Sequence, residues 1–275
     1  MNLSMKTKEE NLKILTQIKE KVISNNLNIK DFEYLHRYVE KENLRLEVLN
    51  RYVDKLKDGV PVQYIVGNTD FYGNTIYVDE NVLIPRFETE LLVEKTIKYI
   101  SKMKKERVNV LDIGTGSGCI AITIAKNVDS VVDAVDISEK AISVAKKNII
   151  HNSVDINIFK SDILSNVKNK YDVIISNPPY ISNDEEIMDI VKYNEPHLAL
   201  YAEDKGLYFY RKILQNVSNY LNKEYLIAFE IGYTQGEEIK NMANKYLKDA
   251  YVWIEKDYSD KDRFVFISNI IKDSY

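Results

Sequence analysis

The chain has 275 residues, of which 45% are hydrophobic and 29% charged, and its 38 Lys and Arg against 42 Asp and Glu give a net charge of −4. This length fits one large domain or a domain with an appendage, and the slightly acidic balance argues against a surface that holds a nucleic-acid backbone. A single cysteine excludes an internal disulfide, three scattered histidines offer no metal-ligand spacing, and no apolar run suits a membrane span or a signal peptide, so we expect a metal-free cytoplasmic protein that binds no membrane.

Residues 1–67 are predicted to form a small helical bundle. The segment Thr7–Glu10 has the spacing of a capping box, so we expect the first helix to begin there. Apolar residues then recur at helical intervals in three groups: Leu12, Leu15, Ile18 and Val22; Phe32, Leu35 and Val39; Leu46, Leu49, Val53 and Leu56. Gly59 and Pro61 break the pattern. The bundle is nearly neutral, with 12 Lys and Arg against 10 Asp and Glu, and both a packing appendage and a partner-docking domain remain open.

Residues 68–88 are predicted to be a β-hairpin linker, because turn residues at Gly73 and Asn74 lie between β-prone flanks. The third domain, residues 89–275, begins with a long helical pattern and then alternates strands with helices. Strands are expected at 108–112, 130–136, 155–159, 172–176, 224–231, 252–254 and 264–267, and helices at 120–126, 138–152, 206–220 and 234–247. This alternation predicts an α/β domain with a mostly parallel, doubly wound sheet.

A glycine-rich loop follows the first of these strands. Its members are Gly114, Thr115, Gly116, Ser117 and Gly118. Glycines at alternate positions let the backbone turn sharply and let a ligand lie against it. The dinucleotide fingerprint would require glycine at the next position, where Cys119 stands, so the loop suits a ligand with no pyrophosphate to hold. Cys119 itself is most simply a small buried packing residue.

Acidic residues follow the next two strands. Asp136 ends the strand at 130–136, where a carboxylate can accept hydrogen bonds from ribose hydroxyls. Together with the glycine loop it predicts a site for S-adenosylmethionine, with S-adenosylhomocysteine as the product, in preference to a plain turn. Asp162 follows the strand at 155–159 and could reach the adenine edge or be a solvated loop residue.

The tetrapeptide Asn177-Pro178-Pro179-Tyr180 follows the apolar strand at 172–176. Neither proline has an N–H, so the chain must leave the sheet, and each proline restricts the preceding residue to extended geometry. The result is a stiff rim at the carboxyl end of a strand, where open α/β sheets bind ligands. The Asn177 side-chain oxygen and the Pro178 carbonyl could each accept an N–H of a planar –NH2 group, and the Tyr180 ring could flank it.

This rim suits methyl transfer to an amide or aromatic amine nitrogen, whose lone pair is delocalised and must be turned toward the electrophile. Fixed acceptors would hold the nitrogen and favour its pyramidalisation, which stabilises the transition state more than the ground state. A sulfonium is already a strong electrophile, so neither a metal nor a strong base is required. We therefore predict Asn177, Pro178 and Tyr180 as catalytic residues and Asn177–Tyr180 as the substrate site.

An ordered series of motifs resembles the peptide-chain release factor glutamine methyltransferases (the PrmC/HemK family) over nearly the whole chain. The motifs are Gly59–Gly67, Leu83–Glu90, Asp112–Gly118, Val135–Ser138, Ser176–Ile181, Glu195-Pro196, Ala199-Leu200, Gly206-Leu207, Glu230–Gly232 and Asp262-Arg263. Two positions depart from the family: Ile163 stands where many members carry an aromatic residue beside the adenine, and Tyr201–Glu203 replaces a stretch that commonly contains glycine.

The resemblance implies a helical N-terminal domain, a hairpin linker and a seven-stranded class I S-adenosylmethionine-dependent methyltransferase (Rossmann-like) domain. It also implies methylation of the glutamine amide in the Gly-Gly-Gln motif of class 1 peptide-chain release factors. Carried over by position, the glycine loop, Asp136 and Asn177 would contact the cofactor, and Asn177–Tyr180 would hold the glutamine. Asp162 and Ile163, in the loop after the strand at 155–159, complete the predicted cofactor contacts.

Three other interpretations are weighed against this one. A methyltransferase acting on the exocyclic amine of adenine in DNA or RNA would use the same acceptors, but it would have to hold a phosphate backbone. A methyltransferase acting on a glutamine of a ribosomal protein fits Arg86–Glu90 less well than the release-factor branch does. A non-catalytic binding module would have no need of Asn177 and Tyr180.

Overall fold

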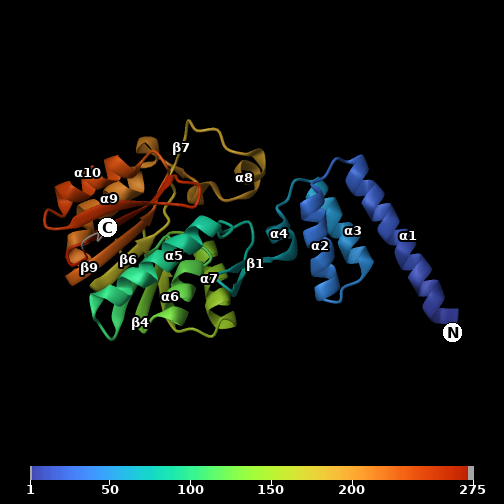
Figure 1. Ribbon diagram of the computed structural model, residues 1–275, viewed down its shortest axis with the longest axis horizontal. Coiled ribbons are helices and arrows are strands. Elements are labelled where there is room, and N and C mark those ends of the chain that lie inside the picture. Colours follow the sequence, from blue (N-terminus) through green and yellow to red (C-terminus); the bar gives the residue numbers. More distant parts are fainter. Residues whose placement is uncertain (1, 272–275) are drawn as a thin grey trace. The chain divides into compact units, whose positions relative to one another are not determined.

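The computed structural model describes residues 2–271 and divides into two compact units (Figure 1). The first unit contains the residues up to Asn68 together with Met188–Asn194, and the second contains Thr69–Ile187 and the residues from Glu195 onward. No helix in the described part of the chain combines the length and the apolar character needed to cross a bilayer.

Helices build the first unit. They are α1 (Asn2–Ser24), α2 (Ile29–Lys41), α3 (Leu46–Lys57), α4 (Val62–Val66) and α8 (Asp189–Asn194). Apolar residues from the periodic positions of α1, α2 and α3 form its core, including Ile18, Leu35 and Leu49. Leu12 is an exception, because its side chain is 66% exposed. The predicted start at Thr7 is wrong: α1 already begins at Asn2, since no glycine or proline precedes Thr7 to stop the helix.

The end of this unit contains two elements that periodicity did not predict. Gly59 has a left-handed φ of +80° just after α3, and Pro61 then serves as the N-cap of the single helical turn α4. Helix α8 comes from far along the chain, and its Asn194 side chain donates a hydrogen bond to the Gly59 carbonyl at 3.0 Å. A segment that begins eight residues after Tyr180 is therefore part of the helical unit.

A seven-stranded sheet in the order β10-β11-β9-β6-β3-β4-β5 forms the centre of the second unit. Its strands are β3 (Val108–Ile113), β4 (Ser130–Asp136), β5 (Ile156–Lys160), β6 (Tyr171–Ser176), β9 (Leu221–Glu230), β10 (Tyr251–Lys256) and β11 (Asp262–Ser268). Neighbours from β5 to β9 pair in parallel, whereas β11 is antiparallel to both β9 and β10. The mostly parallel α/β sheet predicted from the alternation is thus present.

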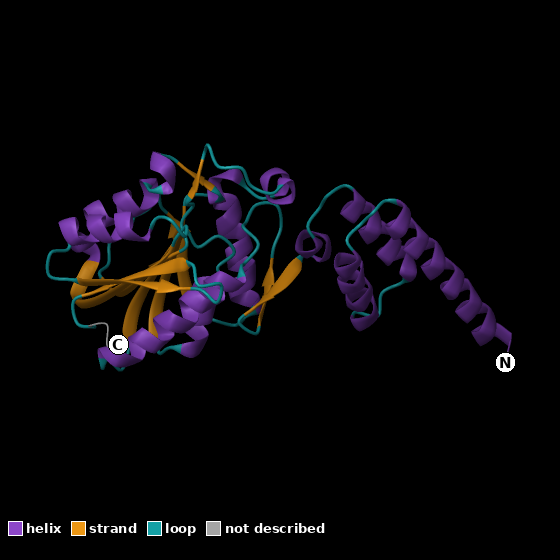
Figure 2. Cartoon of the chain, turned by 45° about the horizontal axis from the view of Figure 1, so that its top comes forward, coloured by secondary structure: helices purple, strands orange, loops and turns teal. Residues whose placement is uncertain are grey.

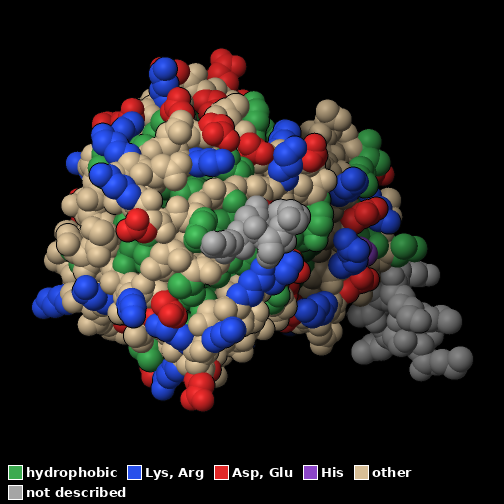
Figure 3. Space-filling model, turned by 60° about the vertical axis from the view of Figure 1, so that its left-hand side comes forward, with side chains coloured by type: hydrophobic (Ala, Val, Ile, Leu, Met, Phe, Trp, Pro, Cys, Tyr) green, Lys and Arg blue, Asp and Glu red, His purple; other side chains and the backbone are tan. Residues whose placement is uncertain are grey.

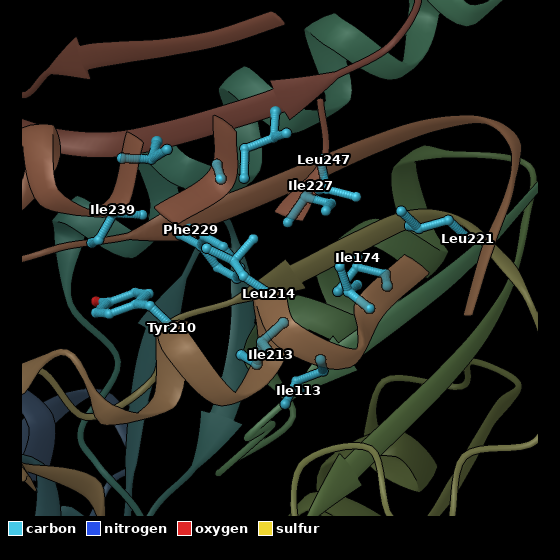
Figure 4. Packing of buried hydrophobic residues seen from close by; sticks show 14 of the residues in the cluster. Ile113, Ile174, Tyr210, Ile213, Leu214, Leu221, Ile227, Phe229, Ile239 and Leu247 are labelled. Atoms are coloured by element: carbon cyan, nitrogen blue, oxygen red, sulfur yellow. The ribbon is translucent and has the colours of Figure 1, made fainter. Parts of the chain in front are cut away.

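Helices cover both faces of this sheet, as Figures 1 and 2 show. One group is α5 (Phe87–Ile100), α6 (Cys119–Asn127) and α7 (Glu139–His151), and the other is α9 (Tyr208–Asn216) and α10 (Gly236–Tyr246). Figure 4 shows Tyr210, Ile213 and Leu214 of α9 packed against the sheet, near Ile174 and Phe229. The predicted helix at 206–220 is shorter than expected, because its last turn, Val217–Tyr220, is a 3₁₀ helix.

Two short two-stranded sheets complete the second unit. One is the hairpin β1 (Asn68–Phe71) and β2 (Asn74–Tyr77), and the other pairs β7 (Ile181–Ser182) with β8 (Tyr201–Ala202). The surface in Figure 3 carries basic and acidic side chains interspersed over the visible face.

Asn148 of α7 joins the hairpin to the glycine loop. Its Oδ1 accepts the Tyr77 N–H at 2.7 Å, and its Nδ2 donates to the carbonyls of Tyr77 at 2.9 Å and Ser117 at 2.8 Å. The side chain is fully buried, so no water can replace these bonds. One amide therefore fixes both β2 and the loop that begins α6.

We predict that Asn148→Ala lowers the free energy of unfolding by about 2–4 kcal/mol, because it leaves buried backbone groups without partners. Asn216→Ala is the matched control, since that exposed side chain bonds only to the Lys212 carbonyl within its own helix. Urea denaturation measures both variants. Equal stability of the two would show that Asn148 does not hold this junction.

Candidate functional site

Four parallel strands end at the same edge of the sheet and bring most of the predicted site residues together. Ile113 pairs with Val135 and Asp136 with Lys160, so the ends of β3, β4 and β5 are level. Ser176 donates from Oγ to the Ile113 carbonyl at 2.7 Å and ties the end of β6 to the end of β3. The glycine loop, Asp136, Asp162 and Asn177 therefore lie along one edge, as expected for a ligand site in a parallel sheet.

The glycine loop provides open space next to its backbone. Gly114 and Gly116 have left-handed φ angles of +71° and +54°, and a Cβ added at either would meet no atom within 4 Å. Gly118 differs, because its Cβ would come within 3.3 Å of Ala145. Thr115 and Ser117 are 4% and 3% exposed, so their side chains serve the interior. The loop thus offers a ligand the backbone at Gly114 and Gly116.

Asp112 lies below this loop, at the end of β3, and has a fully buried carboxylate. Its Oδ2 accepts the Thr115 hydroxyl at 2.6 Å, and the Ala121 N–H also faces the carboxylate. Burial raises the pKa of Asp112 to about 7. Asp112 therefore holds the glycine loop from beneath through the Thr115 hydroxyl.

Asp136 keeps acceptor capacity on a partly exposed carboxylate. Its two oxygens accept the N–H groups of Gly116 at 2.9 Å and Ser138 at 2.8 Å. Burial raises the pKa of this carboxyl. Each oxygen has a further lone pair, which suits the two hydroxyls of a ribose. Together, the open glycine backbone and the spare lone pairs of Asp136 fit S-adenosylmethionine.

The loop after β5 is rigid and strained. Ile163 has φ of +51°, a conformation that β-branched residues rarely adopt. Its carbonyl accepts the Ser161 hydroxyl at 3.0 Å, and the Asp162 N–H donates to Ser165 Oγ at 3.1 Å. Asp162 is exposed at the rim. A pocket of about 310 Å³ borders Asp162 and Ile163 on one side and Tyr208 and Lys212 on the other. Backbone strain of this kind clusters at ligand sites.

The tetrapeptide presents unused acceptors at the end of β6. Asn177 Nδ2 donates to Thr89 Oγ1 at 3.0 Å, which turns its Oδ1 away from Thr89. Among the described residues, none donates a hydrogen bond to Asn177 Oδ1 or to the Pro178 carbonyl. Burial raises the pKa of the Tyr180 hydroxyl, and the nearby Glu230 carboxylate reinforces this effect, so the phenol stays protonated. Two carbonyl oxygens next to one ring can therefore receive a planar –NH2 group.

Gln235 and Gly206 fix the backbone of Tyr180. Gln235 donates from Nε2 to the Tyr180 carbonyl at 2.9 Å and to the Lys205 carbonyl at 3.2 Å. Gly206 has φ of +84°, and a Cβ there would lie 2.1 Å from the Tyr180 oxygen. Only glycine permits this approach. Farther along, the buried Glu195 carboxylate accepts the Ile84 N–H at 3.2 Å and forms an ion pair with Arg86.

Sequence reasoning assigned no role to Thr89, Asp112 or Glu230, which belong to this edge. A usable signal was present for the acids, because each is a carboxylate that directly follows apolar strand residues, Val110-Leu111 before Asp112 and Leu226–Phe229 before Glu230. Thr89 lies in the first turn of α5 between two glutamates and gave no such signal. Cys119 is buried and its pKa is raised to about 12 by burial, in keeping with a packing residue.

Comparisons with known proteins agree with this geometry. Residues 89–195 match the family model "Methyltransferase small domain". The chain is 41% identical over 248 residues to the release factor glutamine methyltransferase of Streptococcus pneumoniae, covering 89% of this chain and 88% of the relative. It is 37% identical over 291 residues to that of Fusobacterium nucleatum, covering 96% and 80%. A solved methyltransferase structure from Pyrococcus furiosus shares the fold, with a TM-score of 0.55, 20% identity and coverage of 73% of this chain and 91% of that one. These matches confirm the predicted class I methyltransferase fold.

We predict that Gly206→Ala displaces the Tyr180 backbone and abolishes methyl transfer, because its Cβ would overlap the Tyr180 carbonyl. Gly73→Ala is the matched control: it has a similar φ of +73°, but its Cβ would meet no atom within 4 Å. That variant should lose only about 1 kcal/mol of stability through strain. Thermal unfolding and turnover test the pair, and a fully active Gly206→Ala enzyme would refute the packing role assigned to Gly206.

Proposed function

The chain belongs to the release factor glutamine methyltransferase family, and from this premise we propose that it methylates the glutamine of the Gly-Gly-Gln motif in class 1 peptide-chain release factors. It is an S-adenosylmethionine-dependent protein-glutamine N-methyltransferase. The acceptor would be the side-chain amide nitrogen. The observation that carries the proposal is the pair of unused oxygens, Asn177 Oδ1 and the Pro178 carbonyl, beside the glycine loop.

The cofactor would be held by the glycine loop and by the loops that follow β4 and β5. Gly114 and Gly116 would approach it with their backbone, Asp136 would accept the ribose hydroxyls, and Asp162 and Ile163 would border the adenine. When bound, S-adenosylmethionine supplies a methyl group on a positively charged sulfur. No described residue has to polarise that group.

The tetrapeptide would hold and orient the glutamine. A primary amide offers two N–H groups, and Asn177 Oδ1 and the Pro178 carbonyl supply two acceptors on a backbone that its prolines make stiff. Holding both N–H groups fixes the amide plane and favours pyramidal nitrogen, which is the geometry of the transition state. The Tyr180 ring, held by Gln235 through its backbone, would flank the amide and exclude water.

We also propose that the helical unit docks the release factor. Its support is the inclusion of Met188–Asn194, so that a segment soon after the tetrapeptide belongs to the same compact unit as the N-terminal helices. A protein that binds these helices would thereby contact a unit that includes a chain segment only a few residues after Tyr180. A release-factor substrate would place the reaction in the cytoplasm.

The decisive experiment follows transfer of labelled methyl groups to four purified acceptors: a class 1 release factor, the same factor with its Gly-Gly-Gln glutamine changed to alanine, ribosomal protein and nucleic acid. We expect label in the first alone and none with an Asn177→Ala enzyme, because that change removes one acceptor. Circular dichroism should report an unchanged fold for the variant. Label in DNA, RNA or ribosomal protein instead of the release factor would contradict the proposal.

Asp136→Ala tests the cofactor site by binding alone. We predict that it raises the Kd for S-adenosylhomocysteine by about ten- to a hundredfold, since hydrogen bonds to a charged group contribute roughly 1.5–3 kcal/mol. Isothermal titration calorimetry measures this value. The control is Asp129→Ala, an exposed acid that precedes β4 and pairs with Arg107. Equal affinity in the two variants would remove Asp136 from the site.

A further inference from the structure

Thr89 and Glu230 connect the tetrapeptide to the end of β9 through a continuous series of hydrogen bonds. Asn177 Nδ2 donates to Thr89 Oγ1 at 3.0 Å, and Thr89 Oγ1 donates to Glu230 Oε2 at 2.7 Å. The Tyr180 hydroxyl faces Glu230 Oε1 at a longer distance of 3.4 Å. Thr89 and Glu230 are only 3% and 1% exposed, so solvent cannot supply alternative partners. Both substrate-holding side chains therefore depend on one buried carboxylate.

The single hydroxyl hydrogen of Thr89 decides which way the Asn177 amide faces. An ionised Glu230 can only accept hydrogen bonds, so the Thr89 hydroxyl must donate its hydrogen to Oε2. Only a lone pair of Thr89 Oγ1 then remains to interact with Asn177. Asn177 then has to present its –NH2 to Thr89, as observed, and its Oδ1 faces the opposite way. An acceptor is thus available to a substrate N–H.

Protonation of Glu230 reverses this order. A protonated carboxyl can donate to Thr89 Oγ1, which releases the Thr89 hydrogen to bond to Asn177 Oδ1. The amide could then rotate by half a turn and place its –NH2 where the oxygen was. The Asn177 –NH2 would then face the N–H groups of the substrate amide, and two donors that face each other disfavour binding of that amide.

We propose that Thr89 and Glu230 are positioning residues that keep the Asn177 oxygen directed at the substrate nitrogen, and that they do so only while the Glu230 carboxylate is ionised. The inference rests on the proposed function, because a carboxamide substrate needs an acceptor at Asn177. Neither residue touches the reacting atoms. They act through Asn177 and, more weakly, through Tyr180.

Five charged or titratable groups face Glu230 from the elements around it. They are Tyr180 after β6, Tyr210 of α9, Arg263 of β11, Glu88 of α5 and Cys119 of α6. Burial raises the pKa of Glu230 to about 7, the Thr89 hydrogen bond and Arg263 oppose this rise, and Glu88 adds to it. Tyr210 donates to the Glu230 backbone carbonyl at 2.7 Å. The ionised form of Glu230, which orients Asn177, therefore becomes populated as the pH rises through about 7.

The pH dependence of folding stability runs opposite to the expected pH dependence of activity. This difference separates a positioning role of Glu230 from a structural one. The raised pKa of Glu230 means that the folded protein binds its proton more tightly than the unfolded chain does. Stability is therefore lost as the pH rises from the ordinary carboxyl pKa toward about 7. Glu230→Gln removes this buried charge, so we expect a melting temperature at alkaline pH no lower than that of the natural protein.

The test compares Glu230→Gln, Thr89→Val and Thr89→Ser in methyl transfer to the release factor across the pKa of Glu230. We expect kcat to fall on the order of a hundredfold in Thr89→Val, with loss of the acid limb of the pH profile, and to recover in Thr89→Ser, which keeps the hydroxyl. Glu230→Gln should lose the acid limb because its amide does not titrate, while its Oε1 can still accept the Thr89 hydrogen. Thr96→Val is the matched control, because this buried threonine of the same helix bonds only to the Leu92 carbonyl. It should keep the natural rate and pH profile.

Asp112 also titrates near this pH, and Thr89→Val distinguishes the two acids. An acid limb that persists unchanged in Thr89→Val or in Glu230→Gln would come from another acid such as Asp112 and would overturn the inference. Side-chain ¹⁵N–¹H resonances of Asn177 in the protein alone provide a readout without substrate. They should shift with the Glu230 titration in the natural protein and not in Thr89→Val. If the Asn177 resonances of the natural protein do not change with pH, the inference is refuted even where release-factor methylation is confirmed. If they shift with pH, the inference is supported even where another substrate is found.

Discussion

Register between parallel strands is the constraint on which the site depends. Backbone pairing sets β3 level with β4 and β6, so that a glycine loop, a carboxylate and an amide from three distant segments reach one edge together. The Ser176 hydroxyl fixes this alignment at its most sensitive point, one residue before Asn177. A slip of one residue along β6 would turn Asn177 to the other face of the sheet. Packing of α9 against β6 and β9 opposes such a slip, because it buries Ile174 and Phe229 in one apolar layer.

Hydrogen bonds to buried partners orient the polar side chains of the site. Asn177, Thr89 and Glu230 form one ordered series of hydrogen bonds, and Tyr180 is fixed at its backbone by Gln235, with a weaker contact from its hydroxyl to Glu230. Buried networks of this kind define a single arrangement only when all members are satisfied. The two oxygens left over are those that a substrate amide would use. The stiff turn that two consecutive prolines impose therefore both fixes the tetrapeptide and leaves these two oxygens without partners.

Sequence patterns predicted the sheet, its helices and the position of the glycine loop because these depend on local periodicity and on glycine and proline chemistry. They did not predict α8, whose place in the helical unit depends on a contact with Gly59 far away in the chain. They also gave Thr115 and Ser117 the same standing as their glycine neighbours, although both side chains turn inward. Thr89 and Glu230 were missed for a related reason. Their role depends on the direction of the hydrogen bonds that join them to Asn177, and these bonds follow only from three-dimensional proximity.

The central claim is that a glutamine nitrogen lies between Asn177 Oδ1 and the Pro178 carbonyl. A crystal structure of the protein with S-adenosylhomocysteine and a glutamine-bearing peptide tests it most directly. We expect the amide nitrogen within hydrogen-bonding distance of both oxygens, with the Asn177 –NH2 still directed at Thr89. A glutamine bound with its nitrogen away from these oxygens, or an Asn177 rotated so that its –NH2 faces the glutamine, would show that these oxygens do not hold the substrate.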